Sequence, residues 1–198
     1  MKIPKQYVSC EEIIKGSRFL SELFLIESQE EVREKIKSQK KKYPDATHVC
    51  HAFICGKNAE IMGMSDDGEP SGTAGRPMLD VLKGSGATNL LVTITRWFGG
   101  TLLGTGGLVH AYGDGVKNVL AAAEFEEFVE KSGFSLSCDY QQYQVVKKIF
   151  ENFTLYEVSE DFGELISIKG QIAQNDFNRL KQQIFDTTNG KVMPILTL

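Results

Sequence analysis

Asn89 to Gly107 has the sequence NLLVTITRWFGGTLLGTGG, an apolar and β-branched run followed at once by a glycine-rich loop. β-Branched residues favour strands, so residues 89–97 are predicted to form the central strand of a sheet. The loop is predicted to open a helix over residues 108–123, whose first backbone N–H groups and positive dipole end favour an anion. Two interpretations of the glycines stay open: they hold a phosphate, or they let the loop fold tightly against its own domain.

An acidic loop precedes this stretch. Residues 66–77 have the sequence DDGEPSGTAGRP and, like the glycine loop, lie between apolar runs. Several glycines on each of two loops indicate that backbone shape matters there, which is typical of a binding site. The candidate binding residues are Asp66, Asp67, Glu69, Ser71, Thr73, Arg76, Arg96, Gly99, Gly100, Thr101, Gly104, Thr105, Gly106 and Gly107.

The charged residues of the two loops allow more than one role. Asp66, Asp67 and Glu69 have the oxygen ligands that Mg²⁺ takes, but aspartates in turns also bond their own backbone. Arg76 and Arg96 are expected either to pair with these carboxylates or to clamp a phosphate, with pairing favoured for at least one. The glycines lack the Lys-Ser/Thr pair of a Walker A motif, so nucleotide binding is not predicted. No cofactor is required, and Mg²⁺ is the alternative.

Histidines and cysteines alternate along residues 48–55. On a strand, His48 and Cys50 share one face while His51 and Cys55 share the other, so these side chains cannot converge on one ion and no metal site is predicted. His48 either faces the acidic loop as a titratable group or is an ordinary core or edge histidine.

Nucleophilic catalysis would need a hydroxyl beside a base. The candidates are Ser71, Thr73, Thr101 and Thr105 with His48 or His110. No G-x-S-x-G elbow supports them, so catalytic residues stay unassigned. Trp97 and Phe98 end the central strand and either stack a base or close the core, with packing favoured.

Upstream, residues 17–26 are predicted to form a strand, and Ser28 with Glu31 a capping box that opens a helix ending before Pro44. This helix ends in Lys37, Lys40, Lys41 and Lys42. These cations either complement the helix dipole in solvent, which is favoured, or form a phosphate-binding patch. Further predicted elements are strands at 47–55 and 60–65 and a helix from Pro77 through Lys83.

From Gly133 onward the predicted order is strand, helix, strand, strand, helix, strand, at residues 134–138, 140–152, 154–159, 164–170, 175–188 and 191–196. This is the ferredoxin-like βαββαβ order, with a hairpin turn at residues 161–163. The predicted fold class is therefore α+β with two domains. Residues 1–130 carry both loops and residues 131–198 form the ferredoxin-like domain, with a boundary near Lys131.

The 198 residues carry a formal net charge of −4, which argues against a generally basic nucleic-acid binder but is compatible with a local basic patch. Four cysteines in a chain without a signal-peptide pattern are expected to be reduced thiols. No apolar run approaches the roughly 18 residues of a membrane span. We expect a cytoplasmic protein with no membrane partner and no DNA specificity.

The run from Ser65 to Gly115 resembles the characteristic block of the IMPACT family, in its bacterial, YigZ-like branch. The match rests on Asp-Asp-Gly-Glu-Pro-Ser-Gly-Thr-Ala-Gly, followed by Arg-Trp-Phe-Gly-Gly and Leu-Gly-Thr-Gly-Gly-Leu at this separation. The resemblance implies a first domain related to ribosomal-protein and translation-factor domains, with helices on one face of a sheet. It also implies a second domain similar to the last domain of elongation factor G.

Eukaryotic members of that family look like regulators that compete for an activator of an amino-acid-starvation kinase and so restrain phosphorylation of an initiation factor. The resemblance therefore implies a translation-associated binding or regulatory protein, whose partner is the ribosome, ribosomal RNA or a translation factor. The alternative is an enzyme acting on a phosphorylated small molecule, with phosphate at the glycine loop and Mg²⁺ at the acidic loop.

Overall fold

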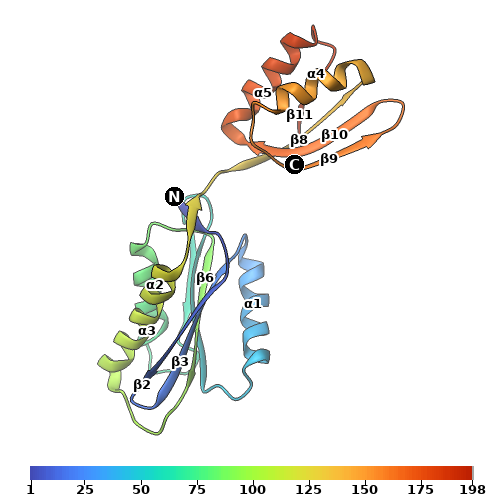
Figure 1. Ribbon diagram of the computed structural model, residues 1–198. Helices are drawn as coiled ribbons and strands as arrows, with labels where there is room; N and C mark the ends of the chain where they lie inside the picture. Colours follow the sequence, from blue (N-terminus) through green and yellow to red (C-terminus); the bar gives the residue numbers. More distant parts are fainter. Residues whose placement is uncertain (198) are drawn as a thin grey trace. The chain divides into compact units, whose positions relative to one another are not determined.

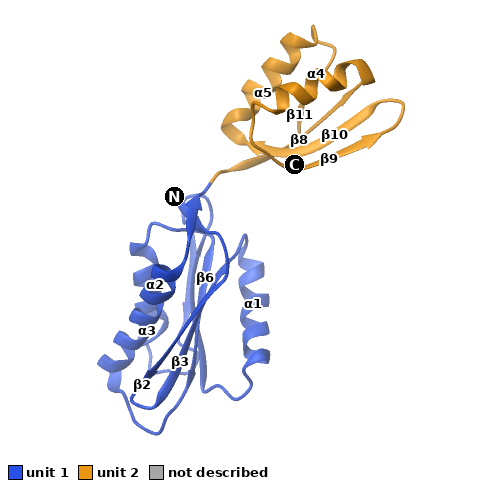
Figure 2. Ribbon diagram, in the orientation of Figure 1, with its two compact units in different colours: residues 1–128 blue, residues 129–198 orange. Residues whose placement is uncertain are grey.

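The computed structural model describes residues 1–197 of the chain (Figure 1). These residues form two compact units, of which the first is Met1–Phe128 and the second begins at Val129 (Figure 2). Both units combine helices with antiparallel sheets, so the α+β class predicted from the sequence is confirmed. No helix among the described residues has the length and apolarity needed to cross a bilayer.

The first unit is built on a five-stranded antiparallel sheet with the order β2-β3-β6-β4-β5. The strands are β2 (Val8–Ile14), β3 (Ser17–Leu25), β4 (His48–Cys55), β5 (Ile61–Ser65) and β6 (Leu90–Trp97). β6 is the middle strand, as its β-branched sequence predicts, and its residues 90–96 are all buried. Near its end, Arg96 lies opposite Phe19 of β3 and His48 of β4, so the register places these three residues side by side.

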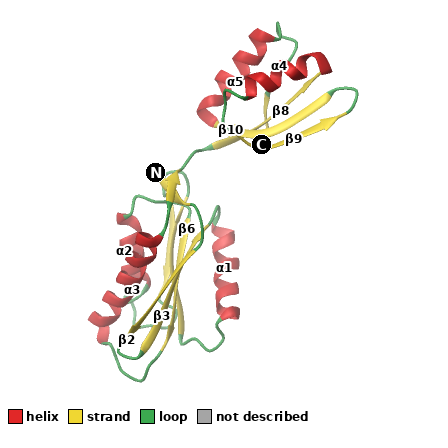
Figure 3. Ribbon diagram, in the orientation of Figure 1, coloured by secondary structure: helices red, strands yellow, loops and turns green. Residues whose placement is uncertain are grey.

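Helices cover both faces of this sheet. α2 (Gly75–Gly84) and α3 (Gly104–Ala122) lie on one face and α1 (Gln29–Lys42) on the other (Figure 3). The expectation that helices cover only one face is therefore wrong. The physical reason is that the central strands are apolar on both sides: Cys50, Ala52 and Ile54 belong to the core beneath α2 and α3, whereas Phe53 and Cys55 belong to the core beneath α1. This alternation confirms that His48 and Cys50 face one side of the sheet and that His51 and Cys55 face the other.

Local signals account for most helix boundaries. Ser28 accepts the backbone N–H of Glu31 at 3.3 Å, and α1 stops at Tyr43, before Pro44. The predicted capping box is only half formed, because the Glu31 carboxylate accepts the N–H of Glu27 instead of that of Ser28. α3 begins at Gly104, four residues before the predicted Leu108. The positive φ of Gly104, +77°, lets the loop turn directly into the helix.

Three strands of the first unit were not predicted from the sequence: β1, β2 and β7. β1 (Lys2–Pro4) pairs with β7 (Phe125–Glu127) and so joins the start of the unit to its end. Three residues are too few to show a period of two. In β2, the adjacent Glu11 and Glu12 interrupt the apolar alternation, so its signal is weak.

The second unit has the predicted ferredoxin-like topology. Its elements are β8 (Lys131–Cys138), α4 (Tyr140–Phe150), β9 (Leu155–Phe162), β10 (Ile166–Ala173), α5 (Gln174–Thr187) and β11 (Ile195–Thr197). The antiparallel sheet has the order β11-β8-β10-β9, and both helices pack on one face around a single core. β9 continues through Phe162, so the hairpin turn lies at residues 163–165, two residues later than predicted.

Candidate functional site

The acidic loop and the glycine loop meet in space. Between them lies a cavity of about 400 Å³ at the end of β6, which we call the loop pocket. It is lined by Thr47, His48, Glu69, Pro70, Arg96, Phe98, Leu102, Leu103, Gly104, Thr105 and Leu108. The lining of this one cavity thus comes from β4, β6, both loops and the first two turns of α3.

A buried ion pair forms one wall of the loop pocket. Arg96 Nη1 donates to Glu69 Oε1 at 2.6 Å, and only 6% of the arginine side chain and 2% of the glutamate side chain are exposed. Tyr112 of α3 donates its hydroxyl to the same oxygen at 2.8 Å, and Arg96 Nη2 donates to Ser17 Oγ at 3.3 Å. Burial, together with Cys50 and Glu69, raises the pKa of Tyr112, so its hydroxyl remains a donor. The pair therefore joins the acidic loop to β6 and α3.

Asp66 shapes the acidic loop through backbone bonds. Its carboxylate accepts the N–H groups of Gly72, Ala74 and Gly75 at 2.8–3.0 Å, at the start of α2. Burial raises the pKa of Asp66, but the three donors outweigh this effect and hold the pKa below its ordinary value. This carboxylate caps α2 in place of Ala74, whose side chain cannot do so.

Asp67 fixes the other end of the loop against β4 and α1. Its backbone has a positive φ of +46°, its Oδ2 accepts the N–H of Val49 at 2.8 Å, and its Oδ1 pairs with Lys40. His48 Nδ1 lies 2.9 Å from the carbonyl oxygen of Asp67, so this nitrogen carries the hydrogen and donates. His48 Nε2 is then turned towards Glu69 Oε2, 3.9 Å away.

Comparison with known proteins gives the family. The Impact N-terminal domain matches residues 15–120, more than half of the chain, and a domain of unknown function, DUF1949, matches residues 136–191. The chain is a member of the IMPACT family. An IMPACT family member of Haemophilus influenzae is 38% identical over 96% of this chain and 94% of its own, and YigZ of Escherichia coli is 34% identical over 92% and 95%.

Solved structures agree with this assignment. A crystal structure of a hypothetical protein matches this IMPACT protein with a TM-score of 0.72 and 31% identity, over 100% of this chain and 97% of that one. The resemblance of the sequence to the IMPACT family, in its YigZ-like branch, is therefore confirmed together with the two-domain α+β fold. The likeness of the second unit to elongation factor G stays a prediction.

The three carboxylates of the acidic loop have different partners in this IMPACT protein. Asp66 holds the start of α2, Asp67 holds β4 and Lys40, and Glu69 holds Arg96 and Tyr112. Among residues 1–197, no group of three His, Cys, Asp or Glu side chains is placed to hold a metal ion. Each of the three carboxylates considered for Mg²⁺ thus has a separate set of protein partners.

Only part of the predicted site lines the loop pocket. His48, Glu69, Arg96, Gly104 and Thr105 do so. The remaining candidates lie outside the lining: Asp66, Asp67, Ser71, Thr73, Arg76, Gly99, Gly100, Thr101, Gly106 and Gly107. Arg96 makes the expected ion pair between the loops, whereas Arg76 pairs with Asp80 of its own helix at 3.0 Å.

Of the nucleophile and base candidates, Thr105 and His48 both line the loop pocket, whereas Ser71, Thr73, Thr101 and His110 lie outside its lining. The Thr73 hydroxyl donates to the carbonyl of Pro70 at 2.6 Å, and His110 is exposed on α3. Cys50, whose thiol donates to the carbonyl of Asp66 at 3.0 Å, lies close to the pocket wall. Burial raises the pKa of Cys50 to about 12, so its thiol is protonated and unreactive at neutral pH.

Close packing explains one glycine of the loop. A Cβ on Gly99 would lie 1.9 Å from the backbone of Gly16, in the turn between β2 and β3, so no side chain fits. Its N–H donates to Ser17 Oγ at 3.2 Å. Gly100 and Gly106, by contrast, face open space. The tight-folding interpretation thus holds for Gly99.

Several lining residues and one partner of the ion pair could not be predicted from the sequence. Pro70, Leu102, Leu103 and Leu108 carry no chemistry that marks a site. Tyr112 follows Leu108 by four residues on the inward face of α3, so the helical spacing places both on the same side, but only the fold reveals that Glu69 lies there.

Proposed function

We propose that this protein is a translation-associated binding protein that holds an apolar side chain of a protein partner in the loop pocket. The observation that carries this proposal is the chemistry of the pocket: an apolar rim above a charge pair that is already matched. Membership of the IMPACT family supports the link to translation, which the resemblance of the sequence implies.

The rim supplies apolar surface that only a partner would cover. Leu102 is 82% exposed and Phe98 is 45% exposed, and both line the loop pocket beside Pro70, Leu103 and Leu108. Burying one such side chain completely stabilises a complex by about 1.5–3 kcal/mol. In protein interfaces a few side chains that fill well-packed, desolvated pockets of the partner carry most of the binding energy.

The charges of the pocket do not favour a highly charged ligand. Arg96 is neutralised by Glu69, and the protein as a whole carries a net charge of −4. Ligand attraction at this site therefore depends on apolar contact and shape. A ribosome-associated protein or a translation factor meets this requirement better than a phosphate backbone does.

Site-specific photocrosslinking tests the proposal. A benzophenone amino acid replaces Leu102 in the full-length protein, and a matched control replaces Ile13, which is 72% exposed on β2 and outside the pocket. We expect the Leu102 probe, but not the Ile13 probe, to form adducts with a ribosomal protein or translation factor. Identical adducts from both positions, or a Leu102 adduct with a protein unrelated to translation, would contradict the proposal.

A phosphorylated small molecule is the second candidate ligand. Arg96 Nε is buried without a hydrogen-bond partner among the described residues, and the first turn of α3, with Gly104 and Thr105 in the pocket lining, has no side-chain cap. These donors suit a phosphate group without a metal ion. Thermal-shift measurements against a panel of phosphorylated metabolites test this alternative: it requires a saturable rise in midpoint, and unchanged midpoints across the panel exclude it.

A further inference from the structure

The helix α1 concentrates positive charge in an acidic protein. Within Gln29–Lys42 there are six lysine or arginine residues and three glutamates, although the whole chain has a net charge of −4. Two of the glutamates lie in the first turn, where they suit the helix dipole, so the excess of cations lies in the C-terminal half. α1 lies on the face of the sheet opposite α2 and α3 (Figure 3). Arg96 lines the loop pocket, whereas the next residue of β6, Trp97, contacts Tyr43 at the C-terminal end of α1, as expected for neighbouring residues of a strand.

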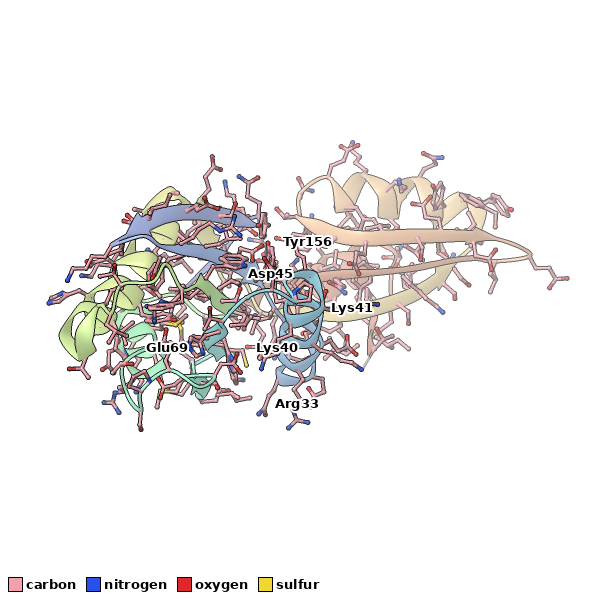
Figure 4. The ribbon with its side chains drawn as sticks, turned by 90° about the horizontal axis from the view of Figure 1, so that it is seen from below. Arg33, Lys40, Lys41, Asp45, Glu69 and Tyr156 are labelled. Atoms are coloured by element: carbon pink, nitrogen blue, oxygen red, sulfur yellow. The ribbon has the colours of Figure 1, made fainter. Side chains whose placement is uncertain are left out.

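Three cations of α1 form an exposed row. Arg33, Lys37 and Lys41 follow one another at intervals of four residues, so they project from one side of the helix with a rise of about 6 Å between successive positions. All three are exposed, and none has an ion pair among the described residues. In Figure 4, Arg33 points away from the sheet. We call this row the α1 stripe.

The other cations of α1 are held by local partners. Lys40 pairs with Asp67 and points towards the acidic loop in Figure 4, where Glu69 is labelled. Lys42 pairs with the buried carboxylate of Glu22 at 3.1 Å, and hydrogen bonding with Tyr43 and Glu22 raises the pKa of Lys42. Lys35 lies over the ring of Phe24. The fold therefore uses these three lysines and leaves the charges of the α1 stripe unbalanced.

An aromatic stack lies at the C-terminal end of the α1 stripe. The ring of Tyr43, two residues after Lys41, contacts the ring of Trp97 edge to face at 5.4 Å. The guanidinium of Arg18 lies 3.7 Å from the centre of the Trp97 ring, and 44% of the Arg18 side chain is exposed. Trp97 is oriented by its indole N–H, which donates to Asp45 at 3.0 Å. We call these residues the Arg18–Trp97 stack.

We propose that the α1 stripe and the Arg18–Trp97 stack bind single-stranded RNA. A row of unpaired cations attracts a phosphate backbone, and a half-exposed stack of guanidinium on indole offers a flat surface on which a nucleobase can stack. An acidic peptide would match the charge, but its carboxylates would not stack on the Arg18–Trp97 stack as a nucleobase can. This surface and its ligand are distinct from the loop pocket, so the proposal goes beyond the binding of a protein partner.

Counterion release gives the proposal a quantitative signature. Each phosphate contact with a single strand lowers the slope of log K against log salt by about 0.7, so three contacts give a slope near −2. Affinity should then fall roughly 20-fold between about 50 and 200 mM salt. Because Trp97 is the only tryptophan of the chain, its fluorescence reports directly on the stack.

The experiment is a titration of the full-length protein with an oligouridine of about 12 nucleotides, followed by anisotropy of a label on the RNA and by Trp97 fluorescence. The test variant is Arg33→Gln/Lys37→Gln/Lys41→Gln, since glutamine preserves the helix. The control variant is Lys83→Gln/Lys148→Gln/Lys191→Gln, which removes the same charge at other exposed positions. Circular dichroism verifies that both variants keep their helix content.

We expect the wild type and the control variant to bind with a slope near −2 and a change in Trp97 fluorescence. We expect the α1 variant to bind at least tenfold more weakly at low salt, with a slope near zero. Equal loss in both variants, or equal binding by all three proteins, would overturn the proposal. An α1-dependent interaction that polyglutamate competes for better than oligouridine would also overturn it in favour of an acidic protein. Loss of crosslinking at Leu102 would leave these results unaffected.

Discussion

Substituting Arg96→Ala should destabilise the first unit strongly. The change leaves the Glu69 carboxylate, of which 2% is exposed, with the Tyr112 hydroxyl as its remaining strong donor. Removing one partner of a buried ion pair typically costs about 3–5 kcal/mol, because the other charge stays buried and uncompensated. The lost hydrogen bond to Ser17 adds to this cost. Since a domain is typically stable by only about 5–15 kcal/mol, this loss is a large fraction of the free energy of unfolding.

Urea denaturation followed by tryptophan fluorescence measures this effect. Trp97 is the only tryptophan of the chain and neighbours Arg96 on β6, so its signal reports the unfolding of the first unit and not of the second. With a slope of about 2 kcal/mol per molar urea, a loss of 4 kcal/mol lowers the midpoint by about 2 M. Glu69→Gln and the double variant complete a mutant cycle, in which we expect the two losses to be strongly non-additive. A loss below about 1 kcal/mol for Arg96→Ala would refute the reasoning, because that is the value of an exposed pair.

Three further predictions concern the loops and the thiols. Gly99→Ala should destabilise the first unit by several kcal/mol because its Cβ meets backbone, whereas Gly106→Ala, in open space on α3, should stabilise it by about 0.5–1 kcal/mol; urea midpoints that rank the two variants in the opposite order would be inconsistent with this packing. Asp66→Ala should cost about 2 kcal/mol at pH 7. The pKa of Asp66 is lowered in the folded state, so its charge-dependent contribution is fully present above the unfolded pKa of about 4 and is lost as the pH falls through the lower folded pKa. In acid titrations the difference between wild type and variant should therefore shrink progressively below about pH 4. Because Cys50 is buried with a pKa raised to about 12, a thiol reagent at about pH 8 should modify the partly exposed Cys10 in the native protein and leave Cys50 unmodified until the protein unfolds, as mass spectrometry would verify.

Sequence analysis was sufficient for the elements whose apolar pattern is long. β6 could be placed at the centre of its sheet because residues 90–95 are apolar or β-branched without interruption, which suits a strand buried on both faces. The βαββαβ order of the second unit followed from the same kind of periodicity, and the sheet order agrees with it. The opposite faces of His48 and His51 followed from strand geometry alone.

What could not be predicted depends on long-range packing. β4 and β6 are apolar on both faces: one face packs against α2 and α3, and the other is left for α1. A sequence pattern that is apolar on both sides does not show which helix covers which face. The pairs β1–β7 and Glu69–Arg96 join residues that are far apart in the sequence. A carboxylate in the acidic loop gives no sign of whether it faces a ligand, its own backbone or a buried arginine.

The site illustrates this limit most clearly. The preference of turn aspartates for their own backbone already suggested the role of Asp66, and pairing of Arg96 with the acidic loop was also expected. The apolar rim of the loop pocket was not foreseen, because exposed leucines such as Leu102 look like ordinary loop residues until their position at the mouth of a cavity is known.

Sedimentation of the tagged protein through a density gradient of cell lysate tests the central claim most directly. The account predicts that wild type and the control variant Ile13→Ser travel with ribosomal particles at low and moderate salt, whereas Leu102→Ser, which removes the most exposed apolar residue of the pocket rim, remains at the top. Wild-type protein that stays at the top in both salts, or Leu102→Ser that sediments like wild type, would contradict it.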